Sequence, residues 1–406
     1  MSLSLPLDLT IKPQQSDYII GLAELMTRVF KGEDLSDIAS ALMARAQLDD
    51  ANALFDLSIL LQLQGNKETA LALQQEALSQ QQLFTLNPTK NSSTLKLLSI
   101  CTTGDLMTNT PLEFIADGAG FHMQTLYIAD HLPLPKKVPE HDIAIVAISE
   151  LDRNLDCLPR VEHFISQLDS VVLNTPANIA QLSRDLVSQN LQNLAGIEVP
   201  ITARASYEQL RRETLSEIAA SLGATINYPI IIRPIDSHAG NQLEKVDCQL
   251  ALMNYLTANP NPEFFIAPFV DYRSADGLYK KYRIMVIGGK PFIAHMAISE
   301  HWMIHYLNAG MIENAEKRFA EAQAMGHFEQ GFALKHQTAF ATLADEIGLE
   351  YFGIDCAETQ DGKLLIFEAC ASLNVHAMDC EKTFPYKKVQ MQKLFDAFLQ
   401  MLEDKK

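Results

Sequence analysis

The sequence predicts a mixed α+β protein in three parts: an α-helical domain over residues 1–90, a small α/β domain over residues 91–176, and a larger α+β domain over residues 177–406. Three observations lead to this prediction. Apolar residues recur at helical spacing through the first part. Short β-rich runs alternate with helical stretches in the second part, as in a parallel sheet covered by helices. The third part holds two pairs of apolar runs joined by glycine-containing turns, which is the pattern of β-hairpins.

Composition narrows the classes of function. The 406 residues leave room for two to four domains, and 48% of them are hydrophobic, which is enough for a core in each part. The net charge of −18 is unlike that of a nucleic-acid-binding protein, which shows a basic face. No nucleic-acid partner is therefore expected, and an anionic ligand would have to be met by local cations.

The cysteines and the apolar runs bear on location. The six cysteines are scattered without a Cys-x-x-Cys pair, which argues against a zinc ribbon or a disulfide framework and fits a reducing compartment. The first residues lack the pattern of a secretory signal, and no run of about 18 apolar residues predicts a membrane span. A cytoplasmic location is expected, and a homodimer is one state that the chain could adopt.

Helical segments are predicted before residue 90 at residues 19–30, 35–46, 51–63 and 67–83. The last two are separated by Gly65-Asn66 and resemble one tetratricopeptide-like unit, with small and apolar residues at matching positions: Leu54, Leu57, Leu61, Ala70 and Ala77. A plain helical bundle is the alternative. Such a unit cannot bury its apolar face alone, so we expect it to pack on a neighbour or on a protein partner. We also expect residues 1–90 to be removable without unfolding the rest.

The second part follows a linker at residues 87–93 and contains β-rich runs at residues 95–101, 122–127, 142–148 and 170–173. The loop after the first run reads CTTGDLMTNTP. Ligands bind at the carboxyl ends of strands in open α/β sheets, so this loop either lines a ligand cleft or is an ordinary polar loop.

The third part is predicted to begin with helices at residues 178–194 and 206–222, which are followed by a buried strand at residues 229–232, by Arg233, and by a loop of small and polar residues at 236–241. Loops of this kind present backbone N–H groups to phosphate, and a cation beside them adds complementary charge. The loop is not a Walker loop, because it has neither the GK[ST] sequence nor the spacing.

Two hairpins follow. The first, over residues 279–298, places Lys281 and Arg283 on one face of a strand, as an anion site or as a charged edge strand that prevents aggregation. The second, over residues 351–367, turns at Gln360-Asp361-Gly362, and its strands carry Asp355 and Glu368 among apolar residues. A divalent cation such as Mg²⁺ would offset their repulsion, although two edge carboxylates are the simpler interpretation. The spacing of His301 and His305 could suit a metal on a helix, but no third ligand is evident.

Together these pieces resemble the ATP-grasp superfamily, which includes glutathione synthetase and D-alanine–D-alanine ligase. The resemblance covers about residues 95–400 and lies in the order and spacing of several motifs: VVLNTP, SRD, AGIEVP, IIIRP, APFV, DGLYKKYRIMVIGGKPF, GIDC and FEA. It implies an ATP-grasp fold preceded by a small α/β domain and by the helical domain. It also implies an ATP-dependent carboxylate–amine ligase that forms an amide or peptide bond through an acyl phosphate, a reaction that depends on positioning and charge neutralisation.

The resemblance assigns roles residue by residue. Arg233 corresponds to a lysine that contacts a nucleotide phosphate, and Arg283 to a basic residue that faces the phosphate or the acyl phosphate. The other nucleotide-binding positions belong to the phosphate-covering loop, the adenine hinge and the basic strand: Ser237, His238, Ala239, Gly240, Pro268, Phe269, Val270 and Lys281. Asp355 and Glu368 correspond to two Mg²⁺ ligands. The substrates would be a small-molecule or peptide carboxylate and an amine, with the helical domain recruiting or capping the substrate.

Two positions depart from the family pattern. Arg233 replaces the usual lysine, which keeps the charge but changes its reach and shape. Cys370 stands where the third metal ligand is usually asparagine, and a thiol is a soft ligand poorly suited to Mg²⁺. Asn374 is a candidate substitute. The alternative function is therefore a degenerate ATP-grasp domain that binds nucleotide or peptide without turnover, as a regulatory or scaffolding module.

Overall fold

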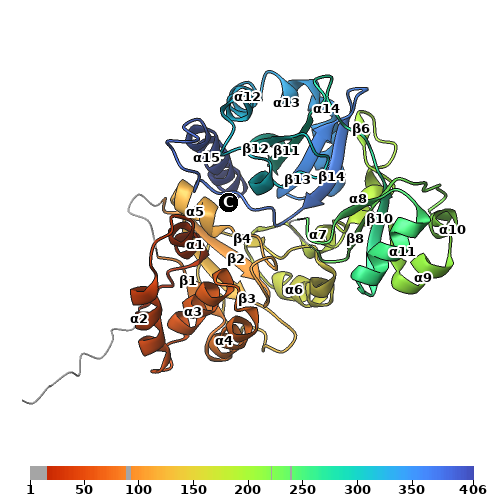
Figure 1. Ribbon diagram of the computed structural model, residues 1–406. Coiled ribbons are helices and arrows are strands. Elements are labelled where there is room, and N and C mark those ends of the chain that lie inside the picture. Colours follow the sequence, from red (N-terminus) through yellow and green to blue (C-terminus); the bar gives the residue numbers. More distant parts are fainter. Residues whose placement is uncertain (1–15, 88–92, 221, 238–239) are drawn as a thin grey trace, which may run out of the picture.

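The computed structural model describes residues 16–87, 93–220, 222–237 and 240–406, and it confirms the predicted mixed α+β fold (Figure 1). Its helices are α1 (Leu22–Phe30), α2 (Ser36–Ala46), α3 (Ala51–Leu63), α4 (Lys67–Gln80), α5 (Glu113–Ala119), η1 (Asp152–Cys157), α6 (Leu158–Ile165), α7 (Pro176–Ile179), α8 (Arg184–Leu191), α9 (Tyr207–Arg212), α10 (Leu215–Ala220), α11 (Gln249–Ala258), η2 (Tyr306–Asn308), α12 (Ala315–Gly326), α13 (Phe332–Lys335), α14 (Gln337–Ile347) and α15 (Lys387–Lys405). Its strands are β1 (Leu83–Thr85), β2 (Lys96–Cys101), β3 (His122–Tyr127), β4 (Ile143–Val146), β5 (Val172–Leu173), β6 (Ile197–Glu198), β7 (Ala203–Ser206), β8 (Ile230–Pro234), β9 (Glu244–Val246), β10 (Glu263–Pro268), β11 (Tyr279–Ile287), β12 (Lys290–Ser299), β13 (Tyr351–Glu358) and β14 (Leu364–Cys370).

The N-terminal helices form where helical spacing predicts them. Asp50 begins α3 by accepting a hydrogen bond from the backbone N–H of Ala53. Gly65, with a φ of 82°, makes the turn to α4. Helix α3 is buried on two sides, because Leu57 packs toward α2 while Phe55 packs toward the first sheet. The tetratricopeptide-like character of α3 and α4 remains a prediction.

The first sheet has the strand order β1-β3-β2-β4-β5, and all its neighbouring strands are parallel except β1 and β3. Side chains alternate between its faces. One face, with Leu97 and Met123, shares a core with α3 and α15, and the other, with Leu98 and Val146, packs on α6 and α8. Figure 1 shows α1 to α4 beside this sheet.

The helices and the first sheet are one packed unit. Strand β1 lies before residue 90 yet pairs with β3. The Phe55 ring stacks on Phe84 with 4.2 Å between centroids, and it lies 5.3 Å from the ring of Tyr127. This shared core argues against the expectation that residues 1–90 can be removed without unfolding the rest, and the three-part division remains a prediction.

The second sheet is antiparallel, with the order β7-β10-β8-β9. Helices α9, α10 and α11 cover it and share its core of apolar side chains. The sheet therefore forms a small subdomain, which lies at the right of Figure 1.

The third sheet has the order β12-β11-β13-β14-β6 and contains both predicted hairpins. Gly288 and Gly289 turn the β11–β12 hairpin with positive φ angles, and Gly362, at 86°, turns the β13–β14 hairpin. Helix α14 packs on one face of the sheet. The opposite face carries the polar residues described below, and α15 crosses from it to α5 of the first unit. Within the described residues, no helix has the length and apolarity needed to cross a membrane.

Candidate functional site

Asp355 and Glu368 face each other directly across the β13–β14 hairpin, where they are register partners. The ladder shifts register immediately after Asp355. Asp355 lies on the face opposite α14, because its neighbours Ile354 and Cys356 belong to the core under α14. The structure thus brings together the two residues that the sequence predicts as a metal-binding pair.

Two cations hold Asp355. The guanidinium of Arg283 donates to both carboxylate oxygens, with distances of 2.9 Å from Nε to Oδ1 and 3.1 Å from Nη2 to Oδ2. Lys281 Nζ lies 2.9 Å from Oδ2. Burial alone would raise the pKa of Asp355, but the charges of Arg283 and Lys281 outweigh it and hold that pKa well below its usual value.

A different cation holds Glu368. Arg184, at the start of α8, forms a salt bridge with the Glu368 carboxylate and donates a 3.0 Å hydrogen bond to the carbonyl of Phe367. Burial raises the pKa of Glu368, but the opposing effect, led by the charge of Arg184, is larger, so the net shift of the pKa is downward. Sequence reasoning did not assign Arg184 a role, although the SRD motif that contains it was part of the resemblance.

Arg233 is a half-buried cation without a carboxylate partner among the described residues. Its guanidinium donates to the hydroxyl and to the carbonyl of Ser237. Burial and then repulsion by Arg184 lower the pKa of Arg233 to about 9, so the group remains charged near neutral pH. Taking a charge out of water is costly unless a counter-ion replaces the lost hydration. Arg233 and Arg184 therefore form a place where an anion would be favourable.

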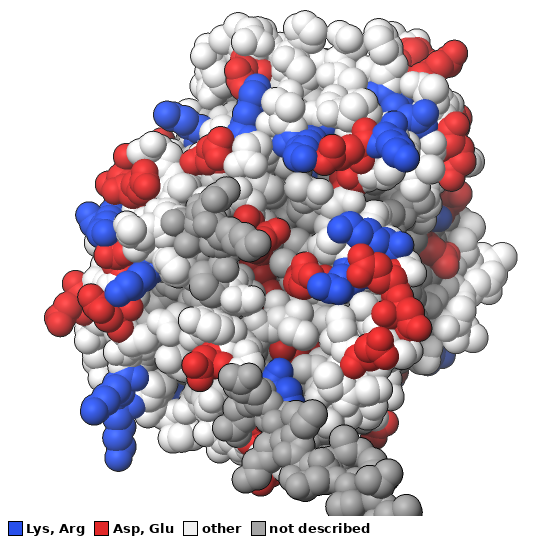
Figure 2. All heavy atoms as spheres, turned by 90° about the vertical axis from the view of Figure 1, so that its left-hand side faces the viewer, with Lys and Arg blue, Asp and Glu red and all other residues white. Residues whose placement is uncertain are grey.

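Cations outnumber carboxylates at this site. Lys281, Arg283, Arg184 and Arg233 lie around Asp355 and Glu368. A third carboxylate, Glu150, lies near Glu368 and accepts the N–H of Ala371 at 3.1 Å. We call the four cations, together with Asp355 and Glu368, the four-cation cluster. The cluster differs from the molecular surface shown in Figure 2, where acidic and basic side chains are interspersed.

The predicted phosphate loop lies beside Arg233. Ser237 accepts from Arg233 Nε at 3.0 Å and donates to the carbonyl of Pro234. Gly240 has a φ of 73°, which favours glycine. The predicted positions His238 and Ala239 lie outside the described residues.

Asp236, the first residue of this loop, connects it to the first unit. Its φ is 57°, and its carboxylate accepts the backbone N–H groups of Asp152 and Arg153 at 2.9 and 3.2 Å. Arg153 also forms a salt bridge with Asp105, in the loop after β2. The phosphate loop is thus tied to a different part of the chain.

The predicted hinge follows β10. Pro268 ends that strand, and the N–H of the next residue, Phe269, already donates to the carbonyl of Pro229 at 2.9 Å. Lys245 Nζ lies 4.4 Å from the centroid of the Phe269 ring, and the ring of Trp302 lies 5.8 Å from it. Lys245 and Trp302 carried no signal that sequence reasoning could have used.

Val270, the last predicted hinge residue, packs against a different group of side chains. Its neighbours form the small apolar cluster around Tyr272 and Tyr279. The three hinge residues therefore have three different environments.

Cys370 and Asn374, the two positions considered for a third metal ligand, differ in their surroundings. The Cys370 thiol lies 3.3 Å from the hydroxyl of Ser372, and burial together with the charge of Glu150 raises its pKa well above the usual value, so it stays a neutral thiol. Asn374 accepts a hydrogen bond from Arg283 with its carbonyl, while its side-chain Oδ1 is buried without a partner among the described residues. Oxygens of Asp355, Glu368 and Asn374 fit a hard cation such as Mg²⁺.

The histidine alternative is not supported. Residues 300–305 form no helix, so His301 and His305 do not share a helical face. In the part of the chain that the structure describes, no group of three or more histidine, cysteine, aspartate or glutamate side chains could hold a metal ion. A metal site would therefore need Asn374 or a ligand from a bound substrate.

Comparisons with known proteins found similar solved structures but no match to a family model or a curated protein. Similar solved structures include the VanG D-Ala:D-Ser ligase from Enterococcus faecalis, with 11% identity, a TM-score of 0.46, and coverage of 76% of this chain and 100% of that one. The D-alanine–D-alanine ligase from Bacillus anthracis has 12% identity, a TM-score of 0.45, and coverage of 77% and 97%. A RimK domain ATP-grasp protein from Sphaerobacter thermophilus has 13% identity, a TM-score of 0.43, and coverage of 76% and 99%. The solved structures to which this chain is similar are thus described as ATP-grasp proteins and ligases.

Proposed function

We propose that this chain is an ATP-dependent ligase that joins a carboxylate to an amine. The observation that carries the proposal is the four-cation cluster, in which two half-buried arginines from separate segments lie together and Arg233 has no carboxylate partner among the described residues. A magnesium-bound triphosphate is a net anion and would supply the missing negative charge. Catalysis of phosphoryl transfer consists largely of positioning and charge neutralisation, which this arrangement suits.

The proposal gives each group a task. Arg233 and Arg184 hold the phosphates, and the Ser237–Gly240 loop covers them. Asp355, Glu368 and Asn374 are the residues that would hold Mg²⁺, which would neutralise charge on the phosphate oxygens. Lys281 and Arg283 occupy both oxygens of Asp355 in the described structure. Their release from Asp355 would free these oxygens and make two cations available to the transferred phosphoryl group.

The proposed reaction has two steps. An oxygen of the substrate carboxylate attacks the γ-phosphorus of ATP, the bond to ADP breaks, and an acyl phosphate forms. The amine nitrogen then attacks the acyl carbon, phosphate leaves, and the nitrogen loses a proton. Arg283, which lies between Asp355 and Asn374, is the group we assign to the charge that develops on the acyl phosphate.

The second candidate function is nucleotide or peptide binding without turnover. Two observations favour it: Cys370 stands at the usual position of a metal ligand, and Asp355 is already neutralised by two cations. Recruitment of a protein partner by the N-terminal helices belongs to either proposal. All six cysteines are free thiols, and the cytoplasmic location remains a prediction.

Thermal unfolding with ATP and Mg²⁺ tests the common part of both proposals, because a ligand that binds the native state stabilises it. We expect ATP with Mg²⁺ to raise the Tm, and Arg233→Ala to abolish most of that rise. Arg212→Ala is the matched control, since the Arg212 side chain is 79% exposed on α9. Equal ATP binding by Arg233→Ala would contradict the phosphate site.

Release of ADP then separates the two functions. Incubation with mixtures of carboxylates and amines should give ADP only when both are present. Binding of ATP without ADP release under any mixture would favour the non-catalytic function.

A further inference from the structure

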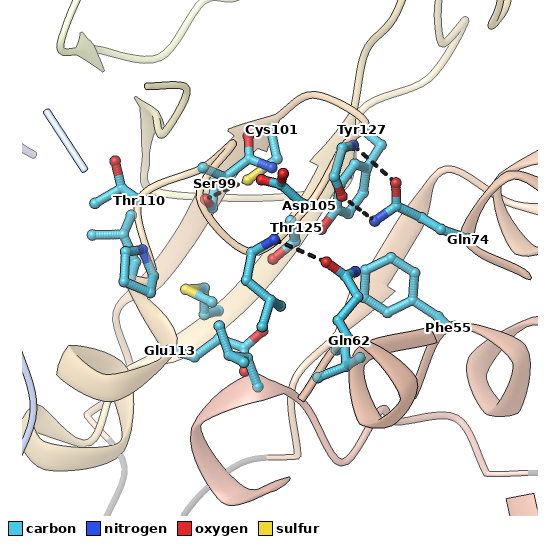
Figure 3. Close-up of a pocket in the computed structure, with 18 residues that line it drawn as sticks. Phe55, Gln62, Gln74, Ser99, Cys101, Asp105, Thr110, Glu113, Thr125 and Tyr127 are labelled. Atoms are coloured by element: carbon cyan, nitrogen blue, oxygen red, sulfur yellow. Dashed lines mark hydrogen bonds between the residues drawn. The ribbon is translucent and has the colours of Figure 1, made fainter. Parts of the chain in front are cut away.

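A second cavity lies outside the four-cation cluster. It opens between helices α3 and α4 and the carboxyl ends of β2 and β3, and it has a volume of about 70 Å³ (Figure 3). About 10–15 Å³ suffices for one water molecule, so this cavity has room for a small organic molecule or several waters. It shares no lining residue with the four-cation cluster. Its wall includes the CTTGDLMTNTP loop, for which the sequence left a ligand cleft as one alternative.

The loop is fixed over the cavity by two glutamines. Gln74 forms two hydrogen bonds of 2.9 Å with the backbone of Gly104, accepting from its N–H and donating to its carbonyl. Gln62 accepts the N–H of Leu106 at 2.9 Å. Figure 3 shows both glutamines extending from the helices to the loop. The cavity is therefore a built feature of the joint between the helices and the sheet.

The inner wall carries polar groups that form no hydrogen bond within the described residues. The hydroxyls of Thr125 and Tyr127 line the cavity and have no hydrogen-bond partner among the described residues. Phe55, Ile59 and Met123 form an apolar side of the same space. Neighbouring polar and apolar surfaces are the usual make-up of a small-molecule site.

The charge of the lining selects the sign of a ligand. Glu113 and Asp105 contribute two carboxylates, and no lysine, arginine or histidine is among the described lining residues. The Glu113 carboxylate accepts the backbone N–H of Ala23 at 3.1 Å, and the N–H of Leu22 also favours its charged form. Burial and the nearby charge of Asp56 raise the pKa of Glu113 to about 7. A positive ligand would relieve this unfavourable environment, and an anion would worsen it.

We propose that this cavity binds a small organic molecule that carries a protonated amine and a short apolar chain. The ammonium pairs with Glu113 and the hydroxyls of Thr125 and Tyr127, and the apolar chain lies against Phe55, Ile59 and Met123. A divalent metal ion is a poorer fit, because one of the two lining carboxylates, Asp105, is already paired with Lys67 and Arg153.

Ligand-detected NMR on the full chain tests the proposal, with n-butylamine as the probe and butan-1-ol and butanoate as neutral and anionic probes of similar size. We expect saturation transfer to n-butylamine, weaker transfer to butan-1-ol and none to butanoate. Glu113→Gln keeps the side-chain size and should weaken n-butylamine binding about tenfold, since hydrogen bonds to charged groups exceed neutral ones in strength. Asp117→Asn is the matched control, because Asp117 lies on the same helix but does not line the cavity, and it should bind as the parent does.

Other outcomes would overturn the proposal. Equal binding of n-butylamine and butanoate would show that charge does not select the ligand. Unchanged n-butylamine binding in Glu113→Gln would place the amine elsewhere. If Glu113→Gln does not fold, Thr125→Val removes one hydroxyl with little change in volume, and we then expect n-butylamine to bind several-fold more weakly. Unchanged binding in Thr125→Val would also exclude this cavity. ATP binding should be the same in all folded variants.

Discussion

Arg184 and Arg233 lie close enough for the charge of one to disfavour the charge of the other. Arg184 begins α8 and Arg233 stands in β8. Glu368, which is paired with Arg184, is the carboxylate whose charge favours the charged form of Arg233. Two like charges held together in a partly buried place favour any ligand that brings negative charge. We therefore expect a phosphate ligand to bind without Mg²⁺, and Mg²⁺ not to bind without a phosphate ligand.

We expect Mg²⁺ alone to leave the Tm unchanged, because Arg283 and Lys281 already neutralise Asp355. Tripolyphosphate without metal should raise the Tm, since it supplies negative charge to Arg184 and Arg233. Thermal unfolding with each ligand separately measures both effects. Arg184→Gln should reduce the effect of tripolyphosphate and, with Mg²⁺ absent, lower the Tm, because Glu368 loses its partner. Stabilisation by Mg²⁺ alone would contradict this order.

Cys370→Asn tests the departure at the third ligand position. An amide oxygen is a harder ligand than a thiol, so we expect Mg²⁺-dependent ATP binding to be unchanged or stronger. Asn374→Ala should weaken it, because it removes a buried Oδ1 that has no hydrogen-bond partner among the described residues. Calorimetric titration of ATP at several Mg²⁺ concentrations compares the two variants. If Cys370→Asn weakened Mg²⁺-dependent ATP binding and Asn374→Ala left it unchanged, the assignment of Asn374 as the third ligand would be wrong.

The shared core predicts that the N-terminal helices are needed for folding. Phe55→Ala should lower the free energy of unfolding by about 3–5 kcal/mol, because it empties a buried space between α3 and the sheet. Phe30→Ala is the control, since Phe30 is 52% exposed. A chain that starts at residue 91 should show no cooperative unfolding transition by circular dichroism. A cooperative transition in that chain would mean that the sheet folds without the helices.

The raised pKa of Glu113 predicts that the difference in stability between the parent and Glu113→Gln depends on pH. Its pKa is raised to about 7 in the folded protein from an ordinary value of 4.5, so the folded state binds more protons than the unfolded state between these values. The favourable contribution of Glu113 is complete below its unfolded pKa and is lost as the pH rises through about 7. The stability of Glu113→Gln relative to the parent should therefore increase from pH 5 to pH 8, by on the order of 2 kcal/mol. Denaturant unfolding at both pH values measures it, and a constant difference would mean that Glu113 titrates normally.

Sequence reasoning reached what local chemistry determines. The two hairpins follow from glycine turns between apolar runs, and the pairing of Asp355 with Glu368 follows from the hairpin register. Lys281 and Arg283 share a face because strands alternate. These features depend on residues near one another in the chain.

The rest depends on tertiary contacts that leave little trace in the sequence. Arg184 meets Glu368 from 184 positions away. Strand β1 is three residues long, too short for a period-two pattern, so its membership in the sheet was not visible. The buried Asp56, which accepts the N–H groups of Ile20 and Gly21, looks like any helical aspartate until the preceding segment packs against it.

The hydrogen bonds from Asp152 and Arg153 to Asp236 have a consequence for rates. In the proposed function, separation of Asp236 from the first unit requires both hydrogen bonds to its carboxylate to break. Nucleotide residence time should then be set by how often this latch opens, and Asp236→Ala should accelerate the release of a fluorescent ATP analogue in stopped-flow measurements more than it slows capture. In the proposed ligase reaction, slow opening of this kind would keep a reactive acyl phosphate enclosed while the second substrate arrives.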